Sequence, residues 1–228
     1  MSSSNLKSEG AKFTTQGVSD YERRRYRCFD QRIVHAREVR LIDKMFERIR
    51  QEEGERQDRW ILDMPCGYGR FAELLAGGER RPAQGCKVIS GDLSFEMVRR
   101  AAEKTGTQGV VADAKLGVPF KAGAFDLVFS IRFFHHVHDA GEREAVLCDF
   151  FRVTSRWAIV SFYRMSGLHT FQRRIRRLFG KSRTNIKMIK AGNFEREAEA
   201  AGFETVSVLP LFRGIHAYHL ALLKKIRI

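Results

Sequence analysis

Three carboxylates and a glycine turn occupy positions where a buried ligand is usually held. Asp63, Asp92 and Asp113 each follow a short apolar run, and the first of them leads into a turn with Gly67 and Gly69. Glycine permits positive φ and has no Cβ, so a ligand can approach the backbone of such a turn. Ligands of open α/β sheets bind outside the carboxyl ends of the strands. We therefore expect the three acids to converge on one crevice beside the turn.

The sign of the charge indicates the class of ligand. Gly67 and Gly69, followed by Ala72, also fit the G-x-G-x-x-A pattern of dinucleotide sites, so an NAD-dependent oxidoreductase is an alternative. Three carboxylates would repel a pyrophosphate. S-adenosylmethionine instead offers a sulfonium, an ammonium, a ribose diol and an adenine amine, all of which carboxylates attract or accept from. The acids therefore predict S-adenosylmethionine as the cofactor.

Each acid also has a local explanation. Asp63 could cap the helix that follows the turn, Asp92 could be a turn residue ahead of an N-cap at Ser94, and Asp113 could be a loop acid. For a single acid the two explanations are balanced. The ordered set at three successive strand ends favours the cofactor.

The segment Leu62–Arg70, with sequence LDMPCGYGR, resembles the first motif of the class I S-adenosylmethionine-dependent methyltransferases, in their broad small-molecule and lipid-type group. The segment Phe125–His136 resembles their fourth motif. The resemblance implies that Asp63 holds the methionine end, that Gly67 and Gly69 admit the cofactor, and that Asp92 binds the ribose hydroxyls. It also implies that Leu93 borders the adenine and that Asp113 with Ala114 binds the adenine amine. Pro65 and Cys66 replace a glycine found in many members, which predicts a stiffer loop.

Residues just after the fourth predicted strand are candidates for the acceptor chemistry. His135, His136 and His138 lie where a base could take a proton from a hydroxyl or ammonium acceptor, although each could instead pack on the following helix. Arg132 could hold an anionic acceptor or pair with a nearby acid, Asp139 or Glu142. Methyl transfer from a sulfonium mainly requires alignment, and we expect no metal site.

The basic residues are concentrated at two places. The net charge is +14, yet residues 61–160 carry 13 basic and 12 acidic side chains. Residues 21–50 carry ten Lys and Arg against five acids, and residues 164–190 carry nine against none. In the resembling family the corresponding flanking segments commonly build the acceptor site, so we expect an anionic acceptor: a phosphorylated or carboxylated sugar, a lipid precursor or another small molecule. The candidate acceptor-binding residues of the second segment are Arg173, Arg174, Arg176 and Arg177.

The same charge leaves two alternatives open. One is an RNA methyltransferase, which the few aromatics of the second segment, Phe171 and Phe179, make weaker because single-stranded bases bind by stacking. The other is a non-catalytic basic adaptor on nucleic acid or membrane. Residues 168–178 could form a basic amphipathic helix on an acidic membrane surface.

The elements that would position these residues alternate between strand and helix. Strand-like runs such as 126–131 and 157–162 are apolar on both faces, as central parallel strands are. Residues 203–211 and 215–223 are separated too briefly for a crossover and should pair antiparallel. This pattern predicts an α/β, Rossmann-like, doubly wound, three-layer fold with a seven-stranded sheet, mostly parallel with an antiparallel C-terminal strand. Asn193 is the expected N-cap of the last helix, and Gly202 its end.

Length and composition bound the organisation of the chain. With 228 residues, 43% of them hydrophobic, we expect one domain rather than a disordered chain. Its parts would be a flexible tail (1–20), a basic helical cap (21–57), a cofactor-binding core (58–163), a basic insertion (164–190), and a final helix with a hairpin (191–228). The chain has no 18-residue apolar run and no apolar segment at its start, which predicts a cytoplasmic protein, with peripheral membrane binding as an option.

Overall fold

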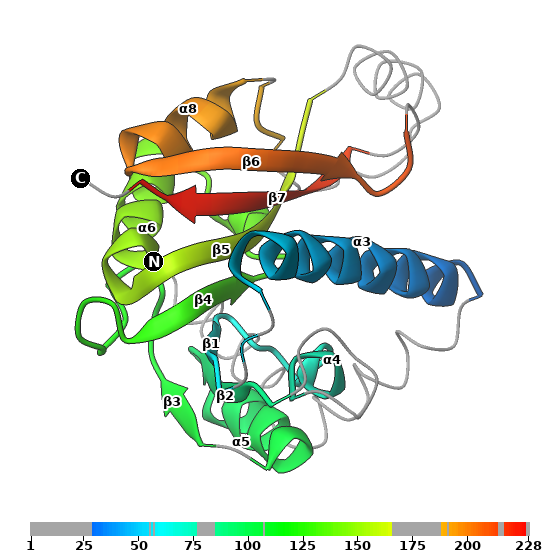
Figure 1. Ribbon diagram of the computed structural model, residues 1–228, viewed down its shortest axis with the longest axis vertical. Helices are drawn as coiled ribbons and strands as arrows, with labels where there is room; N and C mark the ends of the chain where they lie inside the picture. Colours follow the sequence, from blue (N-terminus) through cyan, green and yellow to red (C-terminus); the bar gives the residue numbers. More distant parts are fainter. Residues whose placement is uncertain are drawn as a thin grey trace, which may run out of the picture. The chain divides into compact units, whose positions relative to one another are not determined.

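The computed structural model describes residues 29–54, 56, 58–76, 85–106, 108–165, 188–190, 192–213 and 217–226 (Figure 1). The strands form a seven-stranded sheet in the order β3-β2-β1-β4-β5-β7-β6, flanked by helices. The pairs β1–β2, β2–β3 and β4–β5 are parallel, whereas β7 runs antiparallel to β5 and to β6. The predicted Rossmann-like fold with an antiparallel C-terminal strand is therefore confirmed. The chain divides into two compact units, 1–114 and 115–228.

The first unit carries the glycine turn. Its elements are α3 (Phe29–Glu53), β1 (Trp60–Asp63), α4 (Ala72–Ala76), β2 (Lys87–Asp92), α5 (Phe95–Thr105) and β3 (Gly109–Val111). In α3 the buried residues recur at helical spacing and form an apolar stripe along the helix: Leu41, Ile42, Met45, Phe46 and Ile49. α4 and α5 lie against β2. Because β1, β2 and β3 pair in parallel, their carboxyl ends lie at the same edge of the sheet.

Both ends of α5 are closed by local hydrogen bonds. Ser94 is its N-cap, with Oγ accepting from the Met97 N–H at 3.4 Å, and Gly106 closes it in the left-handed conformation. A side chain that accepts from the first turn replaces the missing intrahelical bonds there. The start of α5, directly after Asp92, is therefore fixed.

The second unit carries the predicted histidines. Its elements are β4 (Phe125–Ser130), the 3₁₀ turn η2 (Phe134–His136), α6 (Ala140–Val153), β5 (Thr154–Tyr163), α8 (Asn193–Ala200), β6 (Phe203–Pro210) and β7 (Tyr218–Lys225). The predicted antiparallel hairpin is present as β6 and β7. Gly202 follows the end of α8 with φ of 94°, as expected, but the N-cap is Gly192 rather than Asn193. Asn193 is already the first helical residue, and its Oδ1 accepts from Arg196 instead of capping the helix.

A buried aromatic cluster anchors the turn after β4. The Phe134 ring lies 5.6 Å from that of Phe194 and 6.3 Å from that of Phe150, and Phe194 stacks on Phe162 with centroids 4.1 Å apart. All four phenylalanines are fully buried. Because Phe134 opens η2, its burial holds the backbone of the two following histidines in place.

Two parts of the predicted organisation lie outside the described residues. These are the tail 1–20 and most of the basic insertion, whose described residues are only 164–165 and 188–190. Within the described part of the chain, no helix is both long enough and apolar enough to cross a membrane.

Candidate functional site

The glycine turn joins β1 to α4 and is tied to the end of β2. The Cys66 N–H donates to the Gly91 carbonyl at 2.7 Å, and the Gly67 N–H donates to Oδ2 of Asp92 at 3.0 Å. Both turn glycines have positive φ, 54° at Gly67 and 74° at Gly69, which favours glycine at each. These bonds place the turn directly beside Asp92.

The two glycines differ in what surrounds them. A Cβ on Gly69 would lie 2.9 Å from the Cα of Ala101, so this glycine allows the turn to pack on α5. A Cβ on Gly67 would meet nothing within 4 Å. Gly69 is therefore required for packing, whereas Gly67 leaves open space at the end of the strands.

Two carboxylates adjoin the turn, one buried and the other half-buried. Asp63 ends β1 and is 4% exposed, and burial together with the charge of Asp92 raises its pKa well above the ordinary value. Burial also raises the pKa of Asp92, although hydrogen bonds from the backbone of Ser94, Gly67 and Leu93 oppose that shift. Burial, followed by these two acids, raises the pKa of the Cys66 thiol, which keeps it protonated. Ionisation of both carboxylates is unfavourable in the free protein, and a bound cation would stabilise their ionised forms.

The local alternatives for these acids can be judged from the hydrogen bonds. Oδ1 of Asp92 accepts from the Ser94 N–H at 3.0 Å, so this residue does shape the turn before α5. Asp63 belongs to β1, and α4 begins only at Ala72. Asp92 therefore has a structural role in addition to any ligand contact.

The remaining predicted cofactor residues follow β2 and β3. Leu93 is 67% exposed directly after Asp92, Asp113 is half-buried, and Ala114 is buried. Asp92 pairs in register with Val111, and the Ala112 N–H donates to the Asp92 carbonyl at 3.0 Å. The structure thus places Asp63, Asp92 and Asp113 at the carboxyl ends of three successive paired strands.

In the second unit, Arg132 has a conformation that is uncommon for a residue with a side chain. Its φ is 62°, its N–H donates to Oγ of Ser161 at 2.6 Å, and its guanidinium lies 5.6 Å from the ring centroid of Tyr218. Left-handed backbone at a non-glycine residue costs free energy and is found disproportionately at functional sites. The two acids proposed as its alternative partners have other bonds: Asp139 caps α6, and Glu142 pairs with Lys115 at 3.3 Å.

The two candidate catalytic histidines are neighbours in η2. Their rings lie 3.9 Å apart, and the His135 ring lies 5.3 Å from that of Tyr163. Burial, followed by the charges of His138 and Lys115, lowers the pKa of His136. His136 is therefore neutral near pH 7, the state in which an imidazole accepts a proton.

Comparison with known proteins identifies the central part of the chain. A family model described as a methyltransferase domain matches residues 62–162. Residues 62–162 form a methyltransferase domain. This match contains Asp63, the glycine turn, Asp92, Asp113 and η2 with its two histidines. For residues 62–162, the predicted resemblance to methyltransferases is confirmed.

Curated relatives of this methyltransferase domain have different named activities. Malonyl-[acyl-carrier protein] O-methyltransferase of Hamiltonella defensa is 30% identical over 115 residues, which cover 50% of the chain and 41% of the relative. Sarcosine/dimethylglycine N-methyltransferase of Halorhodospira halochloris is 39% identical over 102 residues, covering 42% and 34%. The chain thus spans less than half the length of these relatives.

A solved structure shares the fold over nearly the whole chain. Magnesium protoporphyrin IX methyltransferase of Synechocystis PCC 6803, crystallised with bound SAH, has a TM-score of 0.72 and covers 95% of this chain and 97% of its own. Its sequence identity is 17%, so the likeness concerns the fold.

Arg143, within the matched domain, holds the segment 137–139 directly after η2, a role that the sequence does not predict. Its Nε and Nη2 donate to the two carboxylate oxygens of Glu197 at 2.8 and 2.6 Å, and its Nη1 donates to the carbonyls of Val137, His138 and Asp139. The arginine is buried. Its position in a helix rich in both charge signs gives no sequence signal for this role, because the partner Glu197 is 54 residues away. The predicted acceptor residues Arg173, Arg174, Arg176 and Arg177 lie outside the described residues.

Proposed function

We propose that this chain transfers a methyl group from S-adenosylmethionine to a small acceptor that carries a carboxylate or another anionic group. The observation that carries the first half is a pair of carboxylates, buried Asp63 and half-buried Asp92, beside the open space at Gly67. Ionising two neighbouring acids whose pKa values are raised is costly, and a bound cation lowers this cost.

The residues present fit this cofactor. Asp63 would hold the methionine ammonium, and Asp92, with one oxygen already bonded to the Gly67 N–H, would accept from the ribose hydroxyls. Leu93 would border the adenine, and Asp113 with Ala114 would hold the adenine amine. Gly69 would serve the turn through its packing on α5. When bound, the cofactor supplies a methyl group on a sulfonium whose sulfur leaves as a neutral thioether.

The protein's own part in the reaction is alignment and proton removal. Asp63 and Asp92 favour the cationic form of the donor over a neutral competitor. Neutral His136 would take the proton of a hydroxyl or ammonium acceptor, with His135 beside it. Arg132, held by Ser161 in a strained conformation, would fix an anionic group of the acceptor.

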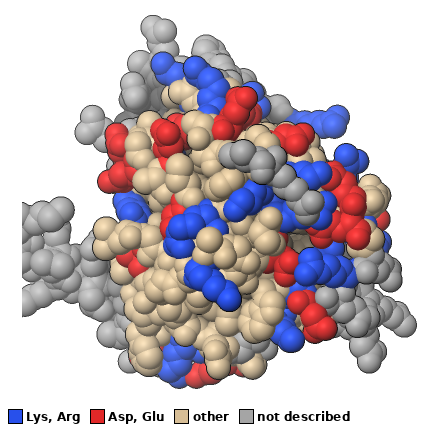
Figure 2. All heavy atoms as spheres, turned by 60° about the vertical axis from the view of Figure 1, so that its left-hand side comes forward, with Lys and Arg blue, Asp and Glu red and all other residues tan. Residues whose placement is uncertain are grey.

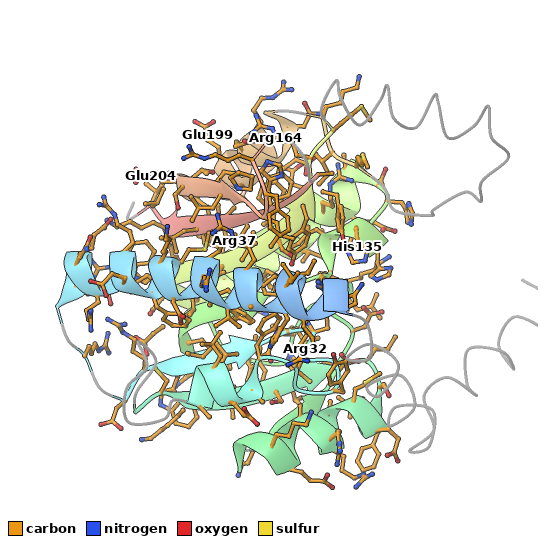
Figure 3. The ribbon with its side chains drawn as sticks, turned by 90° about the vertical axis from the view of Figure 1, so that its right-hand side faces the viewer. Arg32, Arg37, His135, Arg164, Glu199 and Glu204 are labelled. Carbon is orange, nitrogen blue, oxygen red and sulfur yellow. The ribbon has the colours of Figure 1, made fainter. Side chains whose placement is uncertain are left out.

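Exposed cations on α3 support the negative charge of the acceptor. Arg40, Lys44 and Arg48 are exposed at intervals of four residues and form a row along the helix, because each step of four residues turns by only about 40° around the axis. Arg32 is also exposed but lies farther around the helix. Figure 3 shows Arg32 and Arg37 projecting from this helix. On the face that Figure 2 shows, in contrast, basic and acidic side chains are interspersed, as on an ordinary solvated surface.

Most of the named acceptors of the similar proteins agree with this proposal. Malonyl groups, dimethylglycine and protoporphyrin IX contain carboxylates and differ in nearly everything else, whereas the tocopherol of another relative, which is 31% identical over 111 residues, has none. A carboxylate is therefore the chemical feature that we propose for the acceptor of this chain.

The decisive experiment separates cofactor binding from acceptor choice. Calorimetry should show that the protein binds S-adenosylmethionine, that Asp63→Asn lowers the affinity more than tenfold, and that Glu73→Gln, which removes an exposed acid from α4, does not. Incubation with methyl-labelled cofactor and fractionated extract should place label in small carboxylated molecules. Label in RNA would establish the RNA alternative, and heparin or RNA binding without cofactor uptake would establish the adaptor.

A further inference from the structure

Arg70 connects the glycine turn to α3 through a buried ion pair. Its Nη2 lies 2.5 Å from Oε2 of Glu38, and its Nε donates to Nδ1 of His35 at 3.2 Å. Glu38 is completely buried, and the Arg70 side chain is only 9% exposed. The guanidinium also lies 5.3 Å from the ring centroid of Phe71. The position directly after Gly69 is thus fixed from three sides.

One nitrogen of this guanidinium is buried without a partner. Nη1 of Arg70 is buried and makes no hydrogen bond. A buried N–H group of a charged side chain is unfavourable unless something accepts from it. Nε and one N–H of Nη2 already donate to His35 and Glu38, so Nη1 is the guanidinium nitrogen that donates to no acceptor.

The charges of the turn suggest what would accept from Nη1. The amino-acid end of S-adenosylmethionine has an ammonium, which the acids would hold, and a carboxylate, which they would repel. Arg70 is the only basic residue in the sequence from Asp63 to Ala72. Lys104 also reaches the turn, but its Nζ donates to the Tyr68 carbonyl at 2.9 Å and lies over the Tyr68 ring.

We propose that Nη1 of Arg70 binds the α-carboxylate of the cofactor's methionine moiety, with Glu38 as the positioning residue that aims the guanidinium. The inference rests on the proposed function, because it requires S-adenosylmethionine as the ligand. It assigns α3 a part in cofactor binding: the fully buried Glu38 orients an arginine of the turn that follows 32 residues later in the sequence. A planar guanidinium held at two nitrogens presents the third in a fixed direction, which suits a carboxylate.

The test compares two cofactors that differ only in this group. Decarboxylated S-adenosylmethionine keeps the sulfonium, the ammonium, the ribose and the adenine. The wild type should bind S-adenosylmethionine at least about tenfold more tightly than the decarboxylated form, the effect of one hydrogen bond between charged groups. Arg70→Met should remove this preference by weakening only the binding of the carboxylated ligand. Glu38→Gln should reduce the preference, and Arg70→Lys should retain part of it.

The outcomes separate this proposal from the function beneath it. Lys104→Gln is the matched control, and it should leave the ratio of the two affinities unchanged. Equal losses for both ligands in Arg70→Met would reduce Arg70 to a support of the loop and overturn the proposal. Equal affinity of the wild type for the two ligands would overturn it without any variant, so the test survives a variant that fails to fold. A wild type that binds neither ligand would overturn the proposed function itself.

Discussion

At the scale of single residues, ionisation of Asp63 and Asp92 destabilises the folded protein when no cationic ligand is bound. Between pH 3.8, the ordinary pKa of an aspartate, and the raised pKa of Asp63, the folded protein keeps a proton that the unfolded chain has lost. Stability therefore falls as the pH rises through this window, and the full loss is present above it. Burial of Asp92 adds a loss of the same sign.

Asp63→Asn tests this conflict between stability and binding. Because asparagine remains neutral, we expect the variant to be more stable than the wild type at pH 8, by about 1 kcal/mol in the free energy of unfolding. The gain should shrink toward pH 4, because the folded protein keeps the Asp63 proton there and the unfolded chain, with an ordinary pKa of 3.8, has lost only part of it. Urea unfolding at the two pH values measures it, with Glu73→Gln as the control for loss of an acid. A variant less stable than the wild type at pH 8 would contradict the assignment of a costly buried charge.

The two glycines of the turn predict separable effects. Gly69→Ala would place a Cβ against the backbone of Ala101 and should cost about 2 to 3 kcal/mol of stability. Gly67→Ala faces only the positive φ and should cost about 1 kcal/mol, yet its methyl group would fill the open space and lower cofactor affinity about tenfold or more. Thermal unfolding and calorimetry measure the two effects. Full cofactor affinity in Gly67→Ala would mean that the ligand does not use this space.

The spacing of residues in the sequence predicts that the three acids follow strand ends. It does not show which of them has a structural role and which would contact a ligand. Asp92 was predicted both as a ribose ligand and as a turn residue, and its carboxylate does accept from Ser94 and from Gly67. The two interpretations are compatible because a carboxylate has about four lone-pair sites. The strain at Arg132 could not be predicted, since φ at that position depends on the Ser161 hydroxyl from β5.

At the scale of elements, periodicity predicted the strands and helices because each buries one face or both. The error at the start of α8 arose from a rule of local chemistry: Asn193 is a good capping residue, but Gly192 with φ of 76° already turns the chain into the helix. The ion pair between Arg143 of α6 and Glu197 of α8 had no local signal. It depends on two helices meeting in the fold, and no sequence pattern records that contact.

Arg143→Met tests how far this ion pair stabilises the second unit. The substitution leaves the carboxylate of Glu197, which is only 12% exposed, without its partner, and it takes the donor from the carbonyls of residues 137–139. The two losses together should cost about 3 to 5 kcal/mol. Chemical unfolding measures the loss, with exposed Lys121→Met as the control. The double variant Arg143→Met with Glu197→Met should recover part of it, because no lone charge remains. A double variant less stable than the sum of the single losses would argue against a paired charge.

At the scale of the whole molecule, the net charge of +14 lies mostly outside the nearly neutral core, and the described α3 carries an exposed row of it. If this row attracts the acceptor, then Arg40→Glu with Lys44→Glu should raise the acceptor's KM about tenfold, because each reversal changes an exposed interaction with an anion by roughly 1 kcal/mol or less. Cofactor affinity should stay within about twofold, since the proposed cofactor site uses the glycine turn and Arg70 and neither of these two exposed cations. Added salt should weaken acceptor binding in the wild type more than in the variant, because it screens exposed charges.

Steady-state kinetics with the acceptor found by labelling measures both effects, and exposed Lys121→Glu is the control for a change in net charge. An unchanged KM would mean that the row on α3 is only a solvated surface and that the acceptor's charge is recognised elsewhere.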